Sequence, residues 1–243
     1  MYKYIKRFID TIIAFIFLII LFIPMCVVAI CIKLEDGGPV FYKQTRIGKD
    51  LKPFKIYKFR SMRTNRKEFD GKLSHEEMVT NVGKFIRKTS IDELPQIINI
   101  LKGEMAFIGP RPWIEDYYEW FTDEQKRRNE VLPGISGLAQ VKGRNGISIT
   151  DKIKYDVEYV DTMSFLLDLK IWYGTIKTIL RGKEAEISEV GIKDEIEELK
   201  SEKNVSKKTY KLILFTFTVM IFVRYPAFIA FTFTFFTFFL IFL

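Results

Sequence analysis

The stretch IIAFIFLIILFIPMCVVAICI, residues 12–32, decides how this chain is organised, because no charged residue occurs over about 21 positions. An apolar segment of about 20 residues is long enough to cross the hydrocarbon core of a bilayer. Pro24 interrupts it. Because an interior proline removes a backbone hydrogen bond and kinks a helix, the stretch divides into two pieces that are each too short to cross alone. The sequence therefore predicts a membrane helix kinked at Pro24.

Basic residues flank the apolar stretch on both sides. They are Lys3, Lys6 and Arg7 before it, and Lys33, Lys43, Arg46 and Lys49 after it. Since basic flanks stay on the cytoplasmic side, both ends are expected there. A re-entrant hairpin over residues 1–33 places both basic flanks on the cytoplasmic side, whereas a straight signal-anchor span places only one of them there. A cleaved signal peptide is the third alternative, although no small-residue cleavage site follows.

Composition excludes several classes of protein. The chain has 243 residues, of which 28% are charged and 48% hydrophobic, so neither a disordered chain nor a polytopic membrane protein fits. Its two cysteines lie inside the apolar stretch and it has one histidine, which excludes a disulfide framework and a Cys/His zinc site. Any metal must therefore use oxygen ligands. The net charge of +8 favours a polyanionic partner: nucleic acid, an anionic bilayer surface or phosphorylated substrates.

Residues 34–182 have the pattern of a small soluble domain of the α+β class. Short strands are expected at 39–42 and 54–59, and helices at 81–87, 94–102 and 165–180. The last of these has apolar residues at helical spacing. It also carries Trp172 and Tyr173, which suit the interface between protein and lipid headgroups. The sequence thus predicts amphipathic helices that lie at the membrane surface.

Two further segments follow this domain. Residues 183–211 are highly charged and are expected to form a helical linker with little to bury. Residues 212–243 are apolar except for Arg224, and Pro226 lies near their middle. This last segment is predicted to enter a membrane, the alternative being a compositional accident.

The densest signal for chemistry is SIDELP, residues 90–95. In one interpretation Ser90 and Glu93 form a capping box at the start of a helix. In the other, Asp92 and Glu93 are two carboxylates at a helix start, where the dipole favours their ionised forms and also attracts phosphate. An ionised carboxylate that faces a phosphoanhydride can act as a nucleophile or hold Mg²⁺. Both interpretations stay open at this point.

Three cation-rich stretches offer phosphate contacts. In GPRP, residues 109–112, two prolines flank Arg111 and fix its backbone, which suits bidentate phosphate binding, although for this motif alone a turn with an exposed arginine is favoured. The glycine-rich residues 133–146 include Arg144, and glycine lets backbone amides approach phosphate. Residues 55–63, including Lys58, interleave cations with aromatics. Stacking on nucleic acid is the alternative for that stretch, but the chain has no recognisable nucleic-acid module, so we expect lipid phosphate.

The motifs that carry a resemblance occur in a fixed order. They are KRFID (6–10), GPVF (38–41), FKIYKFRSM (54–62), DELPQ (92–96), LKGEM (101–105), GPRP (109–112) and PGISGLAQV (133–141). With these motifs the chain resembles the bacterial sugar transferase family, the small monotopic phosphoglycosyl transferases, over roughly residues 1–182.

The resemblance implies an activity and a set of site residues. The family transfers a sugar 1-phosphate from a UDP-sugar to a polyprenyl phosphate, usually undecaprenyl phosphate. It releases UMP, uses Mg²⁺ and follows a ping-pong course. By resemblance, Asp92 would attack the β-phosphate, and Glu93 would bind Mg²⁺ together with Asp92 or help to deprotonate the acceptor. Arg87, Arg111 and Arg144 would bind substrate phosphate, as would Lys58.

The resemblance also implies a place and partners. The enzyme would start glycoconjugate synthesis at the bacterial inner membrane, with its catalytic domain on the cytoplasmic face. Likeness to the smallest members favours an N-acetylated UDP-hexosamine, and the sequence leaves open whether the chain forms a homo-oligomer. The alternative from another class is a non-catalytic, membrane-anchored scaffold that binds anionic lipid or a partner enzyme, with the acidic pair serving only as a helix cap.

Overall fold

The computed structural model describes residues 2–63, 77–143, 147–180 and 192–224, which form helices and short strands in two units that divide after Ile196. The elements of the first unit begin with helix α1 (Tyr2–Asp36), strands β1 (Phe41–Ile47) and β2 (Pro53–Phe59), and helices α2 (Asn81–Lys88) and α3 (Gln96–Lys102). They continue with β3 (Ala106–Ile108), α4 (Asp123–Lys126), β4 (Gly134–Ser136), α5 (Leu138–Lys142), α6 (Ile149–Thr162) and α7 (Phe165–Leu180). The mixed helix and strand content confirms the α+β class.

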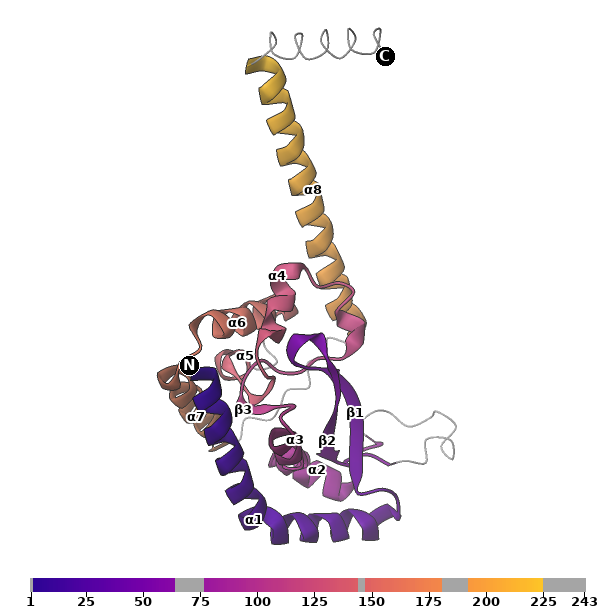
Figure 1. Cartoon of the computed structure of the whole chain (residues 1–243). Coiled ribbons are helices and arrows are strands. Elements are labelled where there is room, and N and C mark those ends of the chain that lie inside the picture. Colours follow the sequence, from indigo (N-terminus) through magenta and orange to yellow (C-terminus); the bar gives the residue numbers. More distant parts are fainter. Residues whose placement is uncertain (1, 64–76, 144–146, 181–191, 225–243) are drawn as a thin grey trace, which may run out of the picture. The chain divides into compact units, whose positions relative to one another are not determined.

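Helix α1 packs against the rest of the first unit on both sides of Pro24. Figure 1 shows its ribbon changing direction along its length, and Pro24 lies inside the helix. Before the proline, Ala14 is buried in the main core cluster with Ile97 and Ile100 of α3. After it, Met25 and Ile32 are buried in a second cluster, with Phe59 of β2 and Ile86 of α2. The other elements of the first unit therefore cover one face of α1, both before and after Pro24.

Polar contacts hold both ends of α1 to this unit. Near the amino terminus, the Arg7 guanidinium donates to the backbone carbonyl of Ile100 at 2.5 Å, at the end of α3. Near the carboxyl terminus, the Glu35 carboxylate accepts from the backbone N–H groups of Asn81 at 2.7 Å and Val82 at 3.1 Å, at the start of α2. The first backbone N–H groups of a helix have no intrahelical partners, so Glu35 satisfies two groups that would otherwise need water. Arg7 adds a second donor to the Ile100 carbonyl, which also accepts from the backbone N–H of Gly103. The two ends of α1 thus lie against one domain.

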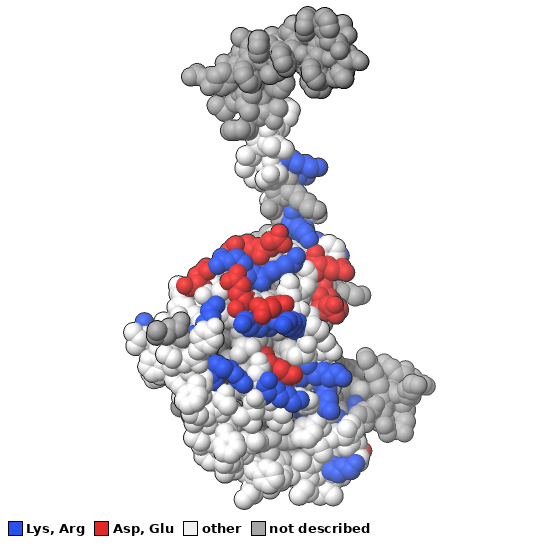
Figure 2. Space-filling view, in the orientation of Figure 1, with Lys and Arg blue, Asp and Glu red and all other residues white. Residues whose placement is uncertain are grey.

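The opposite face of α1 is apolar and exposed. Nine of its residues are 44% to 73% exposed: Ile12, Phe15, Ile16, Ile19, Ile20, Phe22, Ile23, Val27 and Ile30. Within the described part of the chain, α1 is the one helix long and apolar enough to cross a membrane. Helix α7 adds exposed apolar residues, among them Phe165, Leu166, Leu169, Tyr173 and Ile176. Figure 2 shows few charged side chains at the lower end of the molecule, where α1 bends. Such a continuous apolar surface suits contact with lipid.

Two small sheets shape the rest of the domain. Strands β1 and β2 form an antiparallel hairpin in which Phe41 pairs with Phe59 and Ile47 with Pro53. The strand predicted at 39–42 therefore begins two residues later and extends to Ile47, while that predicted at 54–59 is confirmed. Strands β3 and β4 are parallel and were not predicted. Each has only three residues and β3 is fully buried, so neither has an alternating pattern that periodicity could detect.

Backbone packing explains the glycines that the sequence associated with phosphate. A Cβ atom on Gly134 would lie 2.1 Å from the backbone nitrogen of Gly109, and one on Gly137 would lie 2.2 Å from the carbonyl oxygen of Gly109. Only glycine allows two backbones to approach this closely. These two glycines of residues 133–146 therefore pack β4 against the end of β3, and this packing sets the position of the Gly109–Pro112 loop.

The second unit contains most of helix α8 (Ile192–Arg224). The charged linker predicted at 183–211 is helical from Ile192, and the helix continues without a break into the apolar segment that follows. Most of the membrane segment predicted at 212–243, including Pro226, lies outside the described residues.

Candidate active site

The acidic pair lies in a short 3-10 turn, Ile91–Glu93, and not in the first turn of a helix. Ser90 has a left-handed backbone, with φ 59°, and its side chain makes no capping hydrogen bond. Helix α3 begins only after Pro95, at Gln96. The capping-box interpretation is therefore wrong, because the side chain of Glu93 is turned toward cations from other parts of the chain.

Two cations bind the Glu93 carboxylate. The ammonium of Lys58, in β2, lies 2.6 Å from Oε1, and the guanidinium of Arg111, in the loop after β3, lies 3.1 Å from the same oxygen. Burial alone would raise the pKa of Glu93, but the charges and hydrogen bonds of Arg111 and Lys58 outweigh it and hold this pKa at about 2. Glu93 is therefore ionised throughout the physiological pH range.

Asp92 has different surroundings from its neighbour. Within the part of the chain that the structure describes, its carboxylate has neither a hydrogen bond nor an ion pair. Burial, followed by the negative charge of Glu93, raises the pKa of Asp92, while Lys58, Arg87 and Arg111 oppose the rise. A partly desolvated carboxylate without a partner, close to several cations, is well suited to attack an electrophilic phosphorus atom.

The other predicted cations have separate positions. Arg87 is exposed on α2, and its Nε donates to the hydroxyl of Ser61 at 2.8 Å. Its charge acts on Asp92, so it belongs to the same site. Arg144 lies outside the described residues. The structure thus brings Lys58, Arg87 and Arg111 toward the acidic pair.

A buried ion pair, which the sequence analysis missed, supports Arg111. Arg128 and Asp156 have side chains that are each 1% exposed, and their closest atoms are 2.5 Å apart. Arg128 also donates to the backbone carbonyl of Arg111 at 2.6 Å, and its guanidinium lies over the ring of Trp113. The pair fixes the backbone of the loop that carries Arg111. No local pattern could have revealed it, because its members are 28 residues apart.

Arg46, in β1, is a second residue that the sequence analysis did not assign to the site. It had been counted only among the basic residues that flank the membrane segment. Burial, followed by the nearby positive charge of Arg111, lowers the pKa of Arg46, although an arginine remains charged at any physiological pH. The site therefore concentrates more positive charge than Asp92 and Glu93 balance.

The acidic pair fits the magnesium ion that the sequence analysis expected. Among the described residues there is no group of three or more potential metal ligands. Mg²⁺, however, is often bound by one or two carboxylates together with substrate phosphates. The oxygens of Asp92 and Oε2 of Glu93 make no hydrogen bond to another described residue, so they are available to a hard cation. When bound, Mg²⁺ would neutralise part of the charge of a diphosphate.

Comparisons with known proteins agree on one family. A family model described as bacterial sugar transferase matches residues 1–182. The uncharacterized sugar transferase EpsL of Bacillus subtilis (strain 168) is 50% identical over 149 residues, which are 61% of this chain and 74% of EpsL.

Two further relatives have names that state an activity. The UDP-N-acetylgalactosamine-undecaprenyl-phosphate N-acetylgalactosaminephosphotransferase of Aeromonas hydrophila is 44% identical, over 74% of this chain and 45% of the relative. The UDP-glucose:undecaprenyl-phosphate glucose-1-phosphate transferase of Escherichia coli (strain K12) is 38% identical, over 72% of this chain and 40% of the relative. The chain thus spans less than half the length of these two relatives.

Proposed function

This chain belongs to the bacterial sugar transferase family, and from that premise we propose that it transfers a sugar 1-phosphate from a UDP-sugar to undecaprenyl phosphate, with release of UMP. The observation that carries the proposal is the arrangement around the acidic pair. Asp92 has no partner in the described part of the chain, and it lies beside Glu93, which Lys58 and Arg111 hold ionised. The names of the Aeromonas and Escherichia relatives support the choice of substrates.

In the first step, an oxygen of Asp92 attacks the β-phosphorus of the UDP-sugar. A bond forms between this oxygen and phosphorus, and the bond from the β-phosphorus to the bridging oxygen breaks. The electron pair goes to that oxygen, which leaves on UMP. The product on the enzyme is an aspartyl phosphosugar, so no proton has to move in this step.

In the second step, a phosphate oxygen of undecaprenyl phosphate attacks the same phosphorus atom. The bond to Asp92 breaks, and the carboxylate is restored as the undecaprenyl diphosphate sugar forms. Because the acceptor phosphate is already an anion, it needs no strong general base. The course is therefore ping-pong, as in other reactions that pass through a covalent intermediate.

The remaining site residues stabilise charge and are not consumed. Lys58 and Arg111, fixed by Glu93, face the charge that spreads over the phosphoryl oxygens, and Arg87 adds a third cation. Asp92 and Glu93 would hold Mg²⁺ with the diphosphate. By this proposal the acidic pair has two roles, since one carboxylate reacts while the other orders the cations.

We also propose that α1 is re-entrant and that the domain lies on the cytoplasmic face of the bacterial inner membrane. Two observations support this. Arg7 and Glu35, near the two ends of α1, contact the same domain, whereas a straight span would separate them by about the 30 Å of the hydrocarbon core. The exposed apolar face also continues on both sides of Pro24. A shallow helix places the site at the depth of the acceptor phosphate.

We propose an N-acetylated UDP-hexosamine as the donor and the first membrane step of glycoconjugate synthesis as the role. The name of the Aeromonas relative, 44% identical, includes such a sugar, while that of the Escherichia relative names glucose. A panel of UDP-sugars assayed for UMP release with Mg²⁺ and undecaprenyl phosphate identifies the donor.

The decisive experiment tests Asp92. The full-length protein is mixed with donor and Mg²⁺ but without acceptor, and its intact mass is measured. The wild type should gain the mass of a phosphosugar, and Asp92→Asn should gain none and lose at least about 10³-fold in UMP release, or roughly 4 kcal/mol of transition-state stabilisation. The control variant Lys49→Gln removes an exposed charge whose partner is the adjacent Asp50, and it should behave as wild type. Full turnover by Asp92→Asn would exclude Asp92 as the nucleophile, and no turnover of any UDP-sugar by the wild type would favour the scaffold alternative.

A further inference from the structure

A small hollow adjoins the cations that hold Glu93. Its volume is about 20 Å³, and its lining includes Arg46, Lys58, Gln96 and Arg111. A hollow of about this size holds a single water-sized atom, so it can accept one phosphoryl oxygen. Of the described residues, three cations and no carboxylate line it. Its chemistry is therefore that of an anion-binding pocket.

Arg46 is fixed in place and has unused hydrogen-bond donors. One terminal nitrogen donates to the side chain of Gln44 at 2.7 Å, and the other reaches the carbonyl of Pro112 only at 3.5 Å. Among the residues that the structure describes, its buried Nε has no hydrogen-bond partner and its guanidinium forms no ion pair. A buried N–H group without a partner is unfavourable until a ligand accepts from it. A pre-oriented guanidinium of this kind is suited to a phosphate ligand, whose oxygens match its planar fork.

The position of Arg46 relative to the acidic pair decides which phosphate it meets. Lys58 and Arg111 both contact Glu93 and both line the hollow, whereas Asp92 does not line it. A displacement at phosphorus requires the attacking and leaving oxygens to lie roughly in line. If Asp92 attacks the β-phosphorus from one side, then the leaving group must lie on the side away from Asp92, and an anion-binding hollow that Asp92 does not line can receive it.

We propose that Arg46 binds the α-phosphate of the nucleotide donor and stabilises UMP as it leaves, an inference that rests on the function proposed above. When the bond from the β-phosphorus to the bridging oxygen breaks, its electron pair stays on that oxygen and the negative charge of the α-phosphate increases. The hydrogen bonds of Arg46 to this phosphate strengthen as the charge grows. The guanidinium keeps its proton, so Arg46 contributes binding and charge and takes no part in proton transfer.

The test measures binding without turnover. The dissociation constants of UMP and UDP are measured by calorimetry on the full-length protein in detergent, for the wild type and for Arg46→Gln. Loss of a charge-assisted hydrogen bond should weaken UMP about 10- to 100-fold and weaken UDP by a similar factor. Lys49→Gln, the matched control, removes an exposed positive charge three residues away and should change neither constant.

The other outcomes contradict either this proposal or the proposed function on which it rests. Unchanged binding of UMP by Arg46→Gln would show that Arg46 does not contact the α-phosphate, and weaker UDP with unchanged UMP would assign it to the β-phosphate. Equal weakening by Lys49→Gln would show a general effect of charge. Failure of the wild type to bind either nucleotide would instead contradict the proposed function.

A second variant separates binding from folding. Arg46→Lys keeps the charge but loses the planar fork, so UMP affinity should fall less than in Arg46→Gln.

The two half-reactions give a further test. The rate of adduct formation with donor alone should fall in Arg46→Gln, while the reaction of a preformed adduct with undecaprenyl phosphate should not change. A merely structural role for Arg46 would slow both half-reactions.

Discussion

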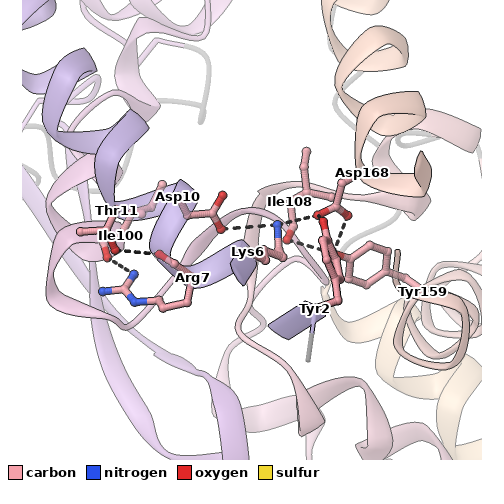
Figure 3. Close-up of polar contacts among 9 residues, drawn as sticks. All are labelled: Tyr2, Lys6, Arg7, Asp10, Thr11, Ile100, Ile108, Tyr159 and Asp168. Carbon is pink, nitrogen blue, oxygen red and sulfur yellow. Dashed lines mark hydrogen bonds and ion pairs between the residues drawn. The ribbon is translucent and has the colours of Figure 1, made fainter. Parts of the chain in front are cut away.

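Two clusters of charged side chains in the first unit differ in burial and in how their charges are paired. In the cluster of Figure 3, the ammonium of Lys6 lies between two carboxylates, 2.8 Å from Asp168 and 3.4 Å from Asp10. The hydroxyls of Tyr2 and Tyr159 also donate to Asp168, at 2.6 Å and 2.8 Å. Both carboxylates and the ammonium are about 10% exposed or less. This cluster joins α1 to α6 and α7 and is closed to solvent.

The active-site cluster is open. Its cations outnumber its carboxylates, the side chain of Arg111 is 49% exposed, and Asp92 has no partner among the described residues. The difference teaches how to distinguish a structural charge cluster from a functional one. When the charged groups are buried and paired with one another, they specify the packing of the elements that they join. When cations are in excess and a carboxylate is left without a partner, the charges remain available to a ligand.

The largest expected change in stability comes from removing Asp168 from the closed cluster. Asp168→Ala leaves the buried ammonium of Lys6 with only its longer contact to Asp10, and loss of one partner from a buried pair costs about 3 kcal/mol or more. We expect the melting temperature in detergent to fall by roughly 6–12 °C. Asp92→Ala removes a carboxylate without a partner, so its melting temperature should stay within about 2 °C of wild type. Similar losses in the two variants would contradict the distinction between the clusters.

The second prediction changes Arg111 in the active-site cluster and compares the effect on activity with the effect on stability. In Arg111→Lys, the planar fork that contacts Glu93 is lost, and kcat/KM for the donor should fall about 10- to 100-fold, equivalent to about 1.4–2.7 kcal/mol. Because the pair with Glu93 is partly exposed, stability should change by less than about 1 kcal/mol. Arg127→Lys serves as the control, since Arg127 pairs on the surface with Glu124 and Asp161. A large fall in stability without a kinetic effect would make Arg111 a structural residue.

The smallest effect concerns one hydroxyl of the closed cluster. Burial, followed by the negative charge of Asp168, raises the pKa of Tyr159, so its phenol stays protonated and keeps donating to Asp168. Tyr159→Phe removes this bond and should cost about 1–2 kcal/mol, or roughly 2–8 °C in melting temperature. Tyr155→Phe, on the same helix, changes a tyrosine outside this cluster and tests whether the effect is specific. If both variants melt alike, the bond contributes little.

Local pattern predicted the elements that have a strong period or a clear boundary. The helices expected at 81–87 and 165–180 occur at Asn81–Lys88 and Phe165–Leu180. The helix expected at 94–102 begins two residues later, because Leu94 ends the preceding 3-10 turn and Pro95 is the N-cap of α3. The capping box failed for a different reason: a cap pattern is local, whereas the cations that attract Glu93 are distant in sequence.

By itself, the sequence determined the apolar helix interrupted by Pro24, the adjacent carboxylates Asp92 and Glu93, and the surplus of cations, because each is a property of neighbouring residues. Only the tertiary structure decided that Lys58, Arg111 and Arg46 surround one hollow and that Arg128 supports the loop behind them. These residues come from separate strands and loops, and their meeting depends on the register of β1 with β2 and of β3 with β4. Long-range packing fixes that register, and no periodicity along the chain encodes it.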